Sequence, residues 1–233
     1  IIEGLVDREK QFTSDVSHEL RTPITVMISE CEFMKDCEKS SPDFVDSLNM
    51  AERQAKKMSV LVTELLTLSR MDKNRITVQI EKTDISELLN FICDEQEKIQ
   101  SSNIKLIRNI ENGIIANIDR ALISRLFVNI ITNAFKYNKE TGSVTVVLKK
   151  DAEFIIFSVK DTGIGISEND LPKIWERFYQ VDRSRSYSEN GGSGLGLAMV
   201  KWIADAVGGE INVQSELGKG STFTFKMKAS DIL

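Results

Sequence analysis

The stretch SHELRTPIT, residues 17–25, contains the only histidine among the 233 residues of the chain. Apolar residues recur at steps of three and four over residues 12–34, which predicts one amphipathic helix around this stretch. On such a helix His18 and Thr22 share a face, and Glu19 is about 100° round from His18. A carboxylate beside an imidazole can act as a base or an orienting group, so the stretch is a candidate nucleophilic site.

The composition is that of a globular protein with one or two domains. The chain is 41% hydrophobic and 28% charged, with a net charge of -5. A negative chain gains nothing from the field of a phosphate backbone, so we expect no nucleic-acid partner. We expect no secretory or membrane-spanning segment within the chain, because its apolar runs are short. The chain does not begin with methionine, so we expect that a longer protein continues upstream.

A pair of long helices is predicted for the first part of the chain. The first is expected over residues 5–38, with Pro23 removing one helical amide beside His18 and loosening the helix there. Whether this proline exposes the histidine or serves packing alone stays open. The second begins after Ser41, and its apolar heptad pattern over residues 44–65 is wider than two helices joined by a short turn can enclose. We therefore expect a homodimer that forms an antiparallel four-helix bundle.

The pattern changes after a polar hinge at residues 72–74, and we divide the chain into domains at 1–73 and 74–233. The second domain alternates strands and helices and is predicted to be a two-layer α/β sandwich, which makes the whole chain an α+β protein. Strands are predicted at 76–80, 104–110 and 114–118, with the last two around the Asn112-Gly113 turn, and two hairpins at 144–148 with 154–159 and at 210–215 with 221–228. Helices are predicted at 84–100, 119–137 and 195–207, and a functional lid at 162–193.

Polar side chains recur on one side of the helix predicted at 119–137. Asn129 and Asn133 are four residues apart, and Lys136 and Tyr137 follow one turn later. Two neutral amides, an ammonium and a phenol on one side suit a hydrated magnesium ion and phosphates, because magnesium prefers oxygen ligands and keeps most of its water.

Two glycine-rich stretches follow that helix. The stretch DTGIGI, residues 161–166, places a carboxylate before glycines that let backbone approach a ligand, although the glycines alone are equally consistent with a simple turn. The carboxylate can accept a hydrogen bond from an exocyclic amine such as that of adenine. The stretch GGSGLGL, residues 191–197, precedes a predicted helix, and the free backbone amides at the start of a helix favour binding of a phosphate group. Between them, Arg177 can reach a terminal phosphate or pair with Glu176 or Asp182.

The ordered set SHELRTPIT, NIITNAFKYN, DTGIGI, WERFYQVD and GGSGLGLAM resembles the H, N, first glycine, F and second glycine boxes of the sensor histidine kinases of two-component systems. The resemblance covers essentially the whole chain, and the order of the motifs is highly specific. It implies a dimerisation and histidine-phosphotransfer domain followed by a catalytic ATP-binding domain of the Bergerat fold. Asn138 stands where Thr or Ser is commoner in the family.

The resemblance also implies residue roles. His18 matches the phosphoacceptor, Glu19 an adjacent base or orienting group, and Thr22 a position that helps to place a water for dephosphorylating the partner. Asn133 matches the magnesium ligand and Asp161 the aspartate that reads adenine. Arg177 is expected to assist catalysis, and the other nucleotide-binding residues are expected to be Asn129, Lys136, Tyr137, Gly163, Gly165, Ile166, Phe178, Gly192, Ser193, Gly194, Leu195, Gly196 and Leu197.

The implied function is that of an ATP- and Mg²⁺-dependent protein-histidine kinase. It would phosphorylate His18, pass the phosphoryl group to an aspartate of a cognate response regulator, and also dephosphorylate that regulator. The chain would be the cytoplasmic portion of a bacterial cell-membrane sensor, with contact to the membrane only through segments outside it. Two alternatives stay open, a degenerate dimeric signalling scaffold and a non-phosphorelay ATPase of the same superfamily. Transfer within or between subunits also stays open.

Overall fold

The structure, a computed structural model, describes residues 2–72, 78–99, 103–181 and 192–229. The chain divides into two compact units, Ile1–Arg75 and Ile76–Leu233, and each is described by itself. Within the described ranges, no helix combines the length and apolar character needed to cross a bilayer. Most of the predicted hinge at 72–74 and the middle of the predicted lid lie outside the described residues.

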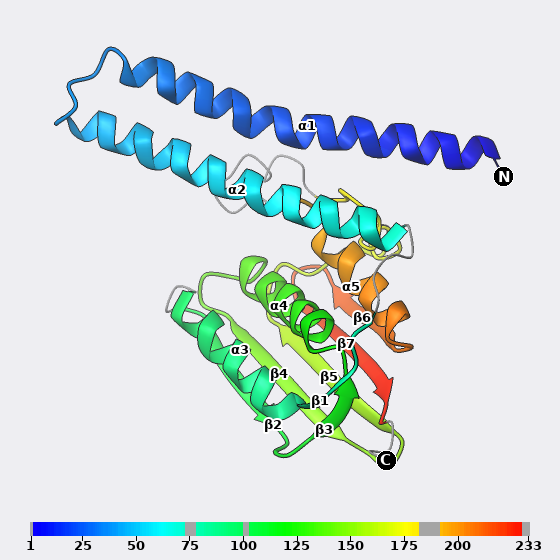
Figure 1. Cartoon of the computed structure of the whole chain (residues 1–233). Coiled ribbons are helices and arrows are strands. Elements are labelled where there is room, and N and C mark those ends of the chain that lie inside the picture. Colours follow the sequence, from blue (N-terminus) through cyan, green and yellow to red (C-terminus); the bar gives the residue numbers. More distant parts are fainter. Residues whose placement is uncertain (1, 73–77, 100–102, 182–191, 230–233) are drawn as a thin grey trace. The chain divides into compact units, whose positions relative to one another are not determined.

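The first unit is a hairpin of two long helices that run side by side, α1 (Ile2–Met34) and α2 (Pro42–Asp72) (Figure 1). The first helix ends before residue 38, because residues 35–37 form turns in which Asp36 N donates to Phe33 O at 3.1 Å. The predicted start of the second helix is confirmed. Ser41 Oγ accepts a hydrogen bond from Phe44 N at 3.2 Å and so caps the helix.

The hairpin covers only part of its own apolar surface. Leu61 and Leu68 are buried, whereas Leu48 and Val62 of the heptad pattern remain 50% and 42% exposed. On the first helix Ile28 is 54% exposed. An apolar stripe this open on a helical hairpin is typical of a surface that another molecule covers.

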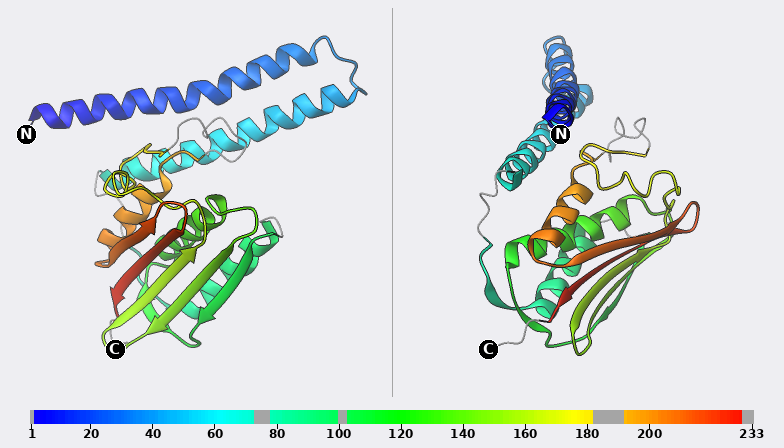
Figure 2. Two further views of the ribbon diagram at one scale, coloured as in Figure 1. Left: turned by 180° about the vertical axis from the view of Figure 1, so that it is seen from behind. Right: turned by 90° about the vertical axis from the view of Figure 1, so that its right-hand side faces the viewer.

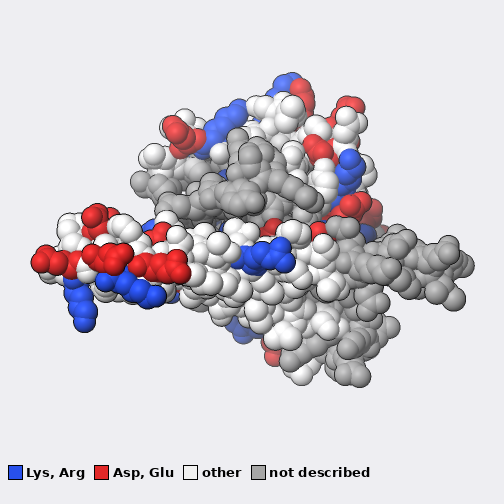
Figure 3. All heavy atoms as spheres, turned by 90° about the horizontal axis from the view of Figure 1, so that it is seen from above, with Lys and Arg blue, Asp and Glu red and all other residues white. Residues whose placement is uncertain are grey.

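Carboxylates gather at the end of the hairpin where the two helices connect (Figure 3). The exposed acidic residues of this end are Glu32, Asp36, Glu38, Asp43 and Asp46. Such a surface repels the phosphate backbone of a nucleic acid and favours a cationic surface.

The second unit is a two-layer α/β sandwich, in agreement with the predicted fold class. A five-stranded mixed sheet has helices α3, α4 and α5 on one face (Figures 1 and 2). The strand order of this sheet is β2-β4-β5-β7-β6, and β1 and β3 form a separate two-stranded sheet. The elements are β1 (Glu81–Asp84), α3 (Ile85–Ile99), β2 (Lys105–Ile110), β3 (Ile115–Ile118), α4 (Arg120–Lys136), β4 (Ser143–Lys150), β5 (Phe154–Asp161), α5 (Gly196–Ala206), β6 (Glu210–Glu216) and β7 (Gly220–Lys228).

The two predicted hairpins are confirmed. Strands β4 and β5 pair antiparallel, as do β6 and β7. Side chains alternate along these strands, so that Val146, Leu148 and Phe157 are buried under the helices. The ring of Phe157 lies 4.3 Å from that of Phe127 on α4, which fixes this helix over the centre of the sheet.

The strand predicted at residues 76–80 is wrong in its described part. Residues 78–80 form no strand, and the first strand begins at Glu81. The amide of Gln79 donates to Asp119 Oδ2 at 2.8 Å instead of joining a ladder. The other carboxylate oxygen of Asp119 accepts from Leu122 N at 3.0 Å and caps α4. One side chain therefore starts α4 and holds the segment that enters the unit.

The pairing implied by the Asn112-Gly113 turn is also wrong. The turn forms, with a φ of 73° at Gly113, but the strands on its two sides enter different sheets. β2 pairs parallel to β4, and β3 pairs antiparallel to β1. A turn signal specifies a change of direction, whereas the partner of each strand is decided by contacts far away in the sequence.

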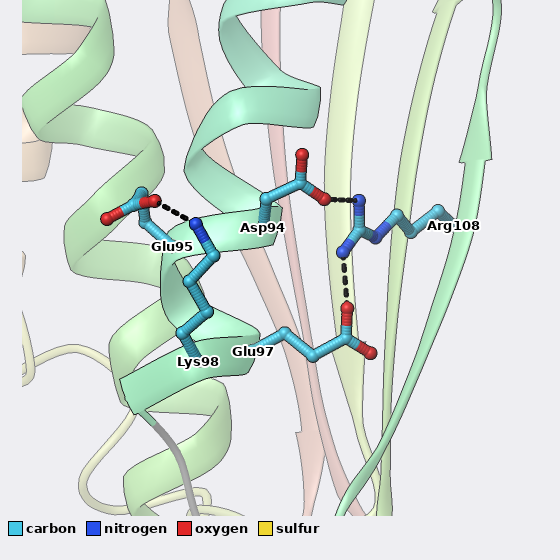
Figure 4. A network of polar contacts seen from close by, with 5 residues as sticks. All are labelled: Asp94, Glu95, Glu97, Lys98 and Arg108. Atoms are coloured by element: carbon cyan, nitrogen blue, oxygen red, sulfur yellow. Dashed lines mark hydrogen bonds and ion pairs between the residues drawn. The ribbon is translucent and has the colours of Figure 1, made fainter.

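An ion-pair network fixes α3 to the edge strand β2 (Figure 4). Arg108 on the strand contacts Asp94 at 2.5 Å and Glu97 at 2.6 Å on the helix. The neighbouring thiol of Cys93 is buried, and burial raises its pKa to about 11. This thiol is therefore protonated at neutral pH and acts as a packing group.

Candidate functional site

The histidine of the first unit lies on the surface of α1. His18 is exposed, Glu19 is half-buried and Pro23 is buried within the helix. The hydroxyl of Thr22 donates to the carbonyl oxygen of His18 at 3.3 Å. The O–H···O distance usual in proteins is about 2.7–2.8 Å, so this bond is long and weak. The hydroxyl can therefore leave the carbonyl oxygen and bond a water molecule at little cost in free energy. The helix thus presents an accessible imidazole with a hydroxyl one turn away.

In the second unit, the last two turns of α4 carry the predicted polar side chains. Asn129, Asn133 and Lys136 are half-buried, and Tyr137 forms the C-cap of the helix. Their neighbours Ile130, Ile131 and Ala134 are buried against the sheet. Because the buried stripe fixes the rotation of the helix, the amides and the ammonium are held on the opposite side.

Asp161, at the end of β5, is the buried carboxylate of the unit's glycine-rich loop. Its Oδ1 accepts hydrogen bonds from Gly163 N at 2.8 Å and from Ser221 N at 3.2 Å. Burial raises the pKa of this carboxyl above its ordinary value, and the two backbone amides oppose the rise. Both amides bond the same oxygen, so they orient the carboxylate without occupying Oδ2.

The loop after Asp161 is held between α4 and the β6–β7 hairpin. Ile164 N donates to Tyr137 O at 3.0 Å, and Gly218 N donates to Ile164 O at 2.7 Å. Ile166 N donates to Ser215 Oγ at 2.8 Å. The loop is therefore hydrogen-bonded both to the end of the helix and to the hairpin, which fixes its backbone.

The second glycine-rich segment approaches the same side of α4. A Cβ atom on Gly192 would lie 2.5 Å from Lys136 Nζ, and one on Gly196 would lie 3.1 Å from Asn129 Oδ1. At the start of α5 Leu195 is completely buried. Glycines at these two positions let the backbone of the segment pass directly beside the amide of Asn129 and the ammonium of Lys136.

Phe178 anchors the segment that joins the two glycine-rich stretches. Its side chain is buried, and its backbone has a φ of 60°. Its amide donates to Gly194 O at 3.0 Å, and Gln180 Nε2 donates to Gly192 O at 2.7 Å. Since a left-handed phenylalanine is costly, the surrounding contacts must hold it. The predicted roles of the half-buried Arg177 and of Ser193 and Leu197 stay predictions.

Several residues that hold this site were not among those predicted from the sequence. Ser215 and Ser221 support the loop from the closing hairpin, and Lys139 Nζ donates to Gly218 O at 2.7 Å. Thr162 donates to Asn138 Oδ1 at 3.1 Å. Serine and threonine in hairpins are common, so no pattern along one chain distinguishes these from solvent-facing residues.

The donor set fits a magnesium–nucleotide complex. The described part of the chain has no cluster of three or more His, Cys, Asp or Glu side chains of the kind that holds a metal by protein ligands alone. Magnesium in phosphoryl-transfer sites is held through a few protein oxygens together with water and substrate phosphates. The amide oxygens of Asn133 and Asn129 supply ligands of that type, and the nearby Lys136 suits the phosphates.

Gly165→Ala is expected to destabilise the second unit by about 3 kcal/mol. Gly165 has a φ of 68°, and a Cβ there would collide with the backbone carbonyl of Glu216. Gly113→Ala is the matched control, because its φ is 73° but no atom lies within 4 Å of the added Cβ. We expect the control to lose about 1 kcal/mol. Both tryptophans, Trp175 and Trp202, lie in this unit, so urea unfolding followed by tryptophan fluorescence measures the difference. Equal losses of unfolding free energy in the two variants would contradict the close packing of the loop against Glu216.

Two families of known proteins match this chain, one in each unit. Residues 8–74 match the His Kinase A (phospho-acceptor) domain. Residues 118–231 match the family described as Histidine kinase-, DNA gyrase B-, and HSP90-like ATPase.

Named relatives match over nearly the whole chain. Sensor histidine kinase WalK of Bacillus subtilis is 36% identical over 229 residues, which is 97% of this chain and 37% of the relative. Sensor protein SrrB of Staphylococcus aureus is 33% identical over 226 residues, which is 96% of this chain and 39% of the relative. The chain therefore spans less than half the length of these relatives.

Solved structures show the same fold. The Acinetobacter baumannii histidine kinase AdeS is 24% identical, with a TM-score of 0.72 over 92% of this chain and 98% of that chain. The histidine kinase ThkA, in complex with the response regulator protein TrrA, is 22% identical, with a TM-score of 0.76 over 98% of this chain and 64% of that chain.

Proposed function

Because the chain belongs to the sensor histidine kinases of two-component systems, we propose that it is an ATP-dependent kinase core that phosphorylates its own His18. The observation that carries the proposal is the convergence of two glycine-rich segments on the polar side of α4. Loop 161–166 is bonded to the end of the helix, and Gly192 and Gly196 lie beside Lys136 and Asn129. A buried carboxylate at one side and an ammonium with amides at the other match the two ends of ATP.

In this proposal, the second unit binds the adenine and the phosphates at separate places. Asp161 Oδ2 accepts a hydrogen bond from the exocyclic amine of adenine, while Oδ1 keeps its two backbone donors. Lys136 and the amides near Gly192 would bind the phosphates, and Asn133 would ligate magnesium with Asn129 in support. When bound, magnesium neutralises charge on the transferring phosphoryl group.

The chemical step joins this site to the first unit. Neutral His18 attacks the γ-phosphorus of ATP through Nε2, the bond from that phosphorus to the bridging oxygen breaks, and ADP leaves with the electron pair. The nucleophile is the unprotonated ring nitrogen, because only this nitrogen has a free electron pair for the attack. Before the attack, Glu19 accepts a hydrogen bond from Nδ1–H, which fixes the tautomer. After the attack, the ring is cationic, and transfer of this proton to the carboxylate of Glu19 makes it neutral. The product is a phosphoramidate.

The proposed partners follow from the first unit. The exposed apolar stripe that includes Leu48 and Val62 supports a homodimer in which two hairpins form a four-helix bundle. A response-regulator aspartate would then accept the phosphoryl group from His18. Since ATP is a cytoplasmic substrate and relatives are named sensor proteins, we place this portion in the cytoplasm of a membrane sensor.

Two other functions have less support. A non-phosphorelay ATPase of the gyrase or chaperone type would use the second unit but has no use for residues 8–74, which match a phospho-acceptor domain. A degenerate scaffold binds no nucleotide, so it would not require the buried Asp161 or the glycine segments packed on α4. Incubation with γ-labelled ATP separates the three. A kinase yields acid-labile label on the chain that EDTA suppresses, an ATPase yields free phosphate alone, and a scaffold yields neither.

Thr22→Ala is expected to slow dephosphorylation of the cognate regulator by at least about tenfold while leaving autophosphorylation intact. The hydroxyl would position the attacking water, and it is held only by its 3.3 Å bond to His18 O. Thr25→Ala is the matched control, because Thr25 makes the same kind of bond, to Arg21 O at 2.9 Å. Release of phosphate from the phosphorylated regulator measures both variants. Equal rates of phosphate release for the two variants would contradict the role of Thr22 in dephosphorylation.

A further inference from the structure

The turn that follows α4 carries a hydrogen-bond network that the proposed chemistry does not use. Asn138 lies at its centre. Its Nδ2 donates to Ala134 O at 3.2 Å and to Ser143 O at 3.0 Å. Its Oδ1 accepts from Lys139 N at 2.9 Å and from Thr162 Oγ1 at 3.1 Å. All four hydrogen-bonding positions of the amide are filled, which fixes its orientation.

Thr162 extends the network to a second loop. Ser143 N donates to Thr162 Oγ1 at 2.8 Å, and Thr162 N donates to Ser143 O at 3.2 Å. A Cβ on Gly142 would lie 2.8 Å from the same threonine oxygen. The network therefore joins the end of α4, the start of β4 and the loop after β5 with no room for an added side chain.

This network links the two segments that carry the proposed nucleotide-binding residues. Thr162 directly follows Asp161, and Asn138 directly follows Tyr137. The main chain joins the two halves through the bond from Ile164 N to Tyr137 O. The side chains of Asn138 and Thr162 add a second link, at the residue that directly follows Asp161. The separation between the Asp161 carboxylate and the side chains of α4 depends on both links.

We propose that Asn138 and Thr162 are a positioning pair that sets the preference of the site for adenine. The inference rests on the proposed function, in which Asp161 accepts a hydrogen bond from the exocyclic amine. That bond weakens steeply when its direction changes, whereas phosphate binding by several amides and an ammonium tolerates small shifts. Loosening the pair therefore weakens binding of ATP more than binding of ITP, which has a carbonyl in place of the amine.

The test measures the dissociation constants of ATP and ITP by calorimetry on the full chain. Asn138→Ala and Thr162→Val are each expected to weaken ATP binding about tenfold and ITP binding much less, so that the ratio of the two constants falls towards one. Because the two residues act as a pair, the double variant is expected to bind ATP with about the same affinity as the single variant that binds it less tightly.

Two controls separate positioning from a loss of stability. Asn212→Ala removes an exposed amide that donates to Glu210 Oε1 at 2.8 Å on β6. Gly208→Ala strains a turn of the same unit, with a φ of 68° and no atom within 4 Å of the added Cβ. Both are expected to keep the wild-type ratio of ATP to ITP affinity. Thr162→Val alone is decisive if Asn138→Ala does not fold.

The outcomes distinguish this inference from the proposed function. A wild-type preference for ATP that survives in both pair variants, even with lowered thermal stability, overturns the positioning role and leaves the kinase proposal intact. A wild-type chain that binds ATP and ITP equally overturns both the adenine role of Asp161 and the inference. A fall in the ratio for the pair variants and for neither control supports the inference.

Discussion

His18→Gln is expected to abolish acid-labile phosphate on the chain incubated with γ-labelled ATP, a loss of at least about 10³-fold. His18 is the only histidine of the sequence, so no other imidazole can replace it as acceptor. Glutamine is similar in length and polarity but has no nucleophilic ring nitrogen. The residue is exposed on α1, so its replacement leaves no buried polar group without a partner.

Nucleotide binding provides the control for this variant. The second unit has its own core and holds all the residues assigned to ATP, so His18→Gln should bind ATP with wild-type affinity. Treatment of the labelled wild-type protein with acid should release the label, whereas alkali should not. Label that persists on His18→Gln would remove this residue as the acceptor and with it the central step of the proposed function.

Asp161→Asn is expected to weaken ATP binding by about 10- to 100-fold, since a hydrogen bond to a charged group contributes about 1.5–3 kcal/mol. The substitution is selective because both backbone donors, Gly163 and Ser221, bond Oδ1. An asparagine oxygen can keep these bonds, while its amide replaces the Oδ2 acceptor with a donor that opposes the adenine amine. Asp151→Asn, in the exposed turn of the β4–β5 hairpin, is the matched control.

The pH dependence of stability distinguishes this variant from one that simply misfolds. Burial raises the folded-state pKa of Asp161 above 3.8, so the folded chain holds this proton more tightly than the unfolded chain. The carboxyl therefore costs stability as pH rises from the unfolded value through the folded one. Asp161→Asn lacks this cost and should gain stability relative to wild type across that window. A variant that is less stable than wild type at neutral pH and also fails to bind would show that the loss is structural.

The sequence predicted the parts of the site that depend on short spacing. The four-residue step from Asn129 to Asn133 placed both amides on one side of a helix, and the caps at Ser41 and Asp119 marked where helices begin. Alternation predicted the two hairpins. These features are local, because a helix or a strand imposes its period on neighbouring residues whatever lies elsewhere in the chain.

The pairing of strands that are distant in the sequence could not be predicted from the sequence. The Asn112-Gly113 turn has a hairpin signature, yet β2 pairs with β4, more than thirty residues along, and β3 pairs with β1. The segment before β1 has an apolar alternation, yet Gln79 bonds the carboxylate of Asp119 in place of a neighbouring strand. Each choice depends on which backbone groups are left without partners once the whole sheet has formed.

The candidates for the reacting and binding groups come from the sequence alone, which contains a single histidine, paired asparagines and two glycine-rich stretches in an order that resembles one family. Only the tertiary structure decided how those groups are held. Ser221 supports Asp161 from sixty residues away, and Asn138 joins Thr162 across two loops. Supporting residues of this kind have no periodic pattern, because their partners are set by packing between elements rather than by neighbours in the chain.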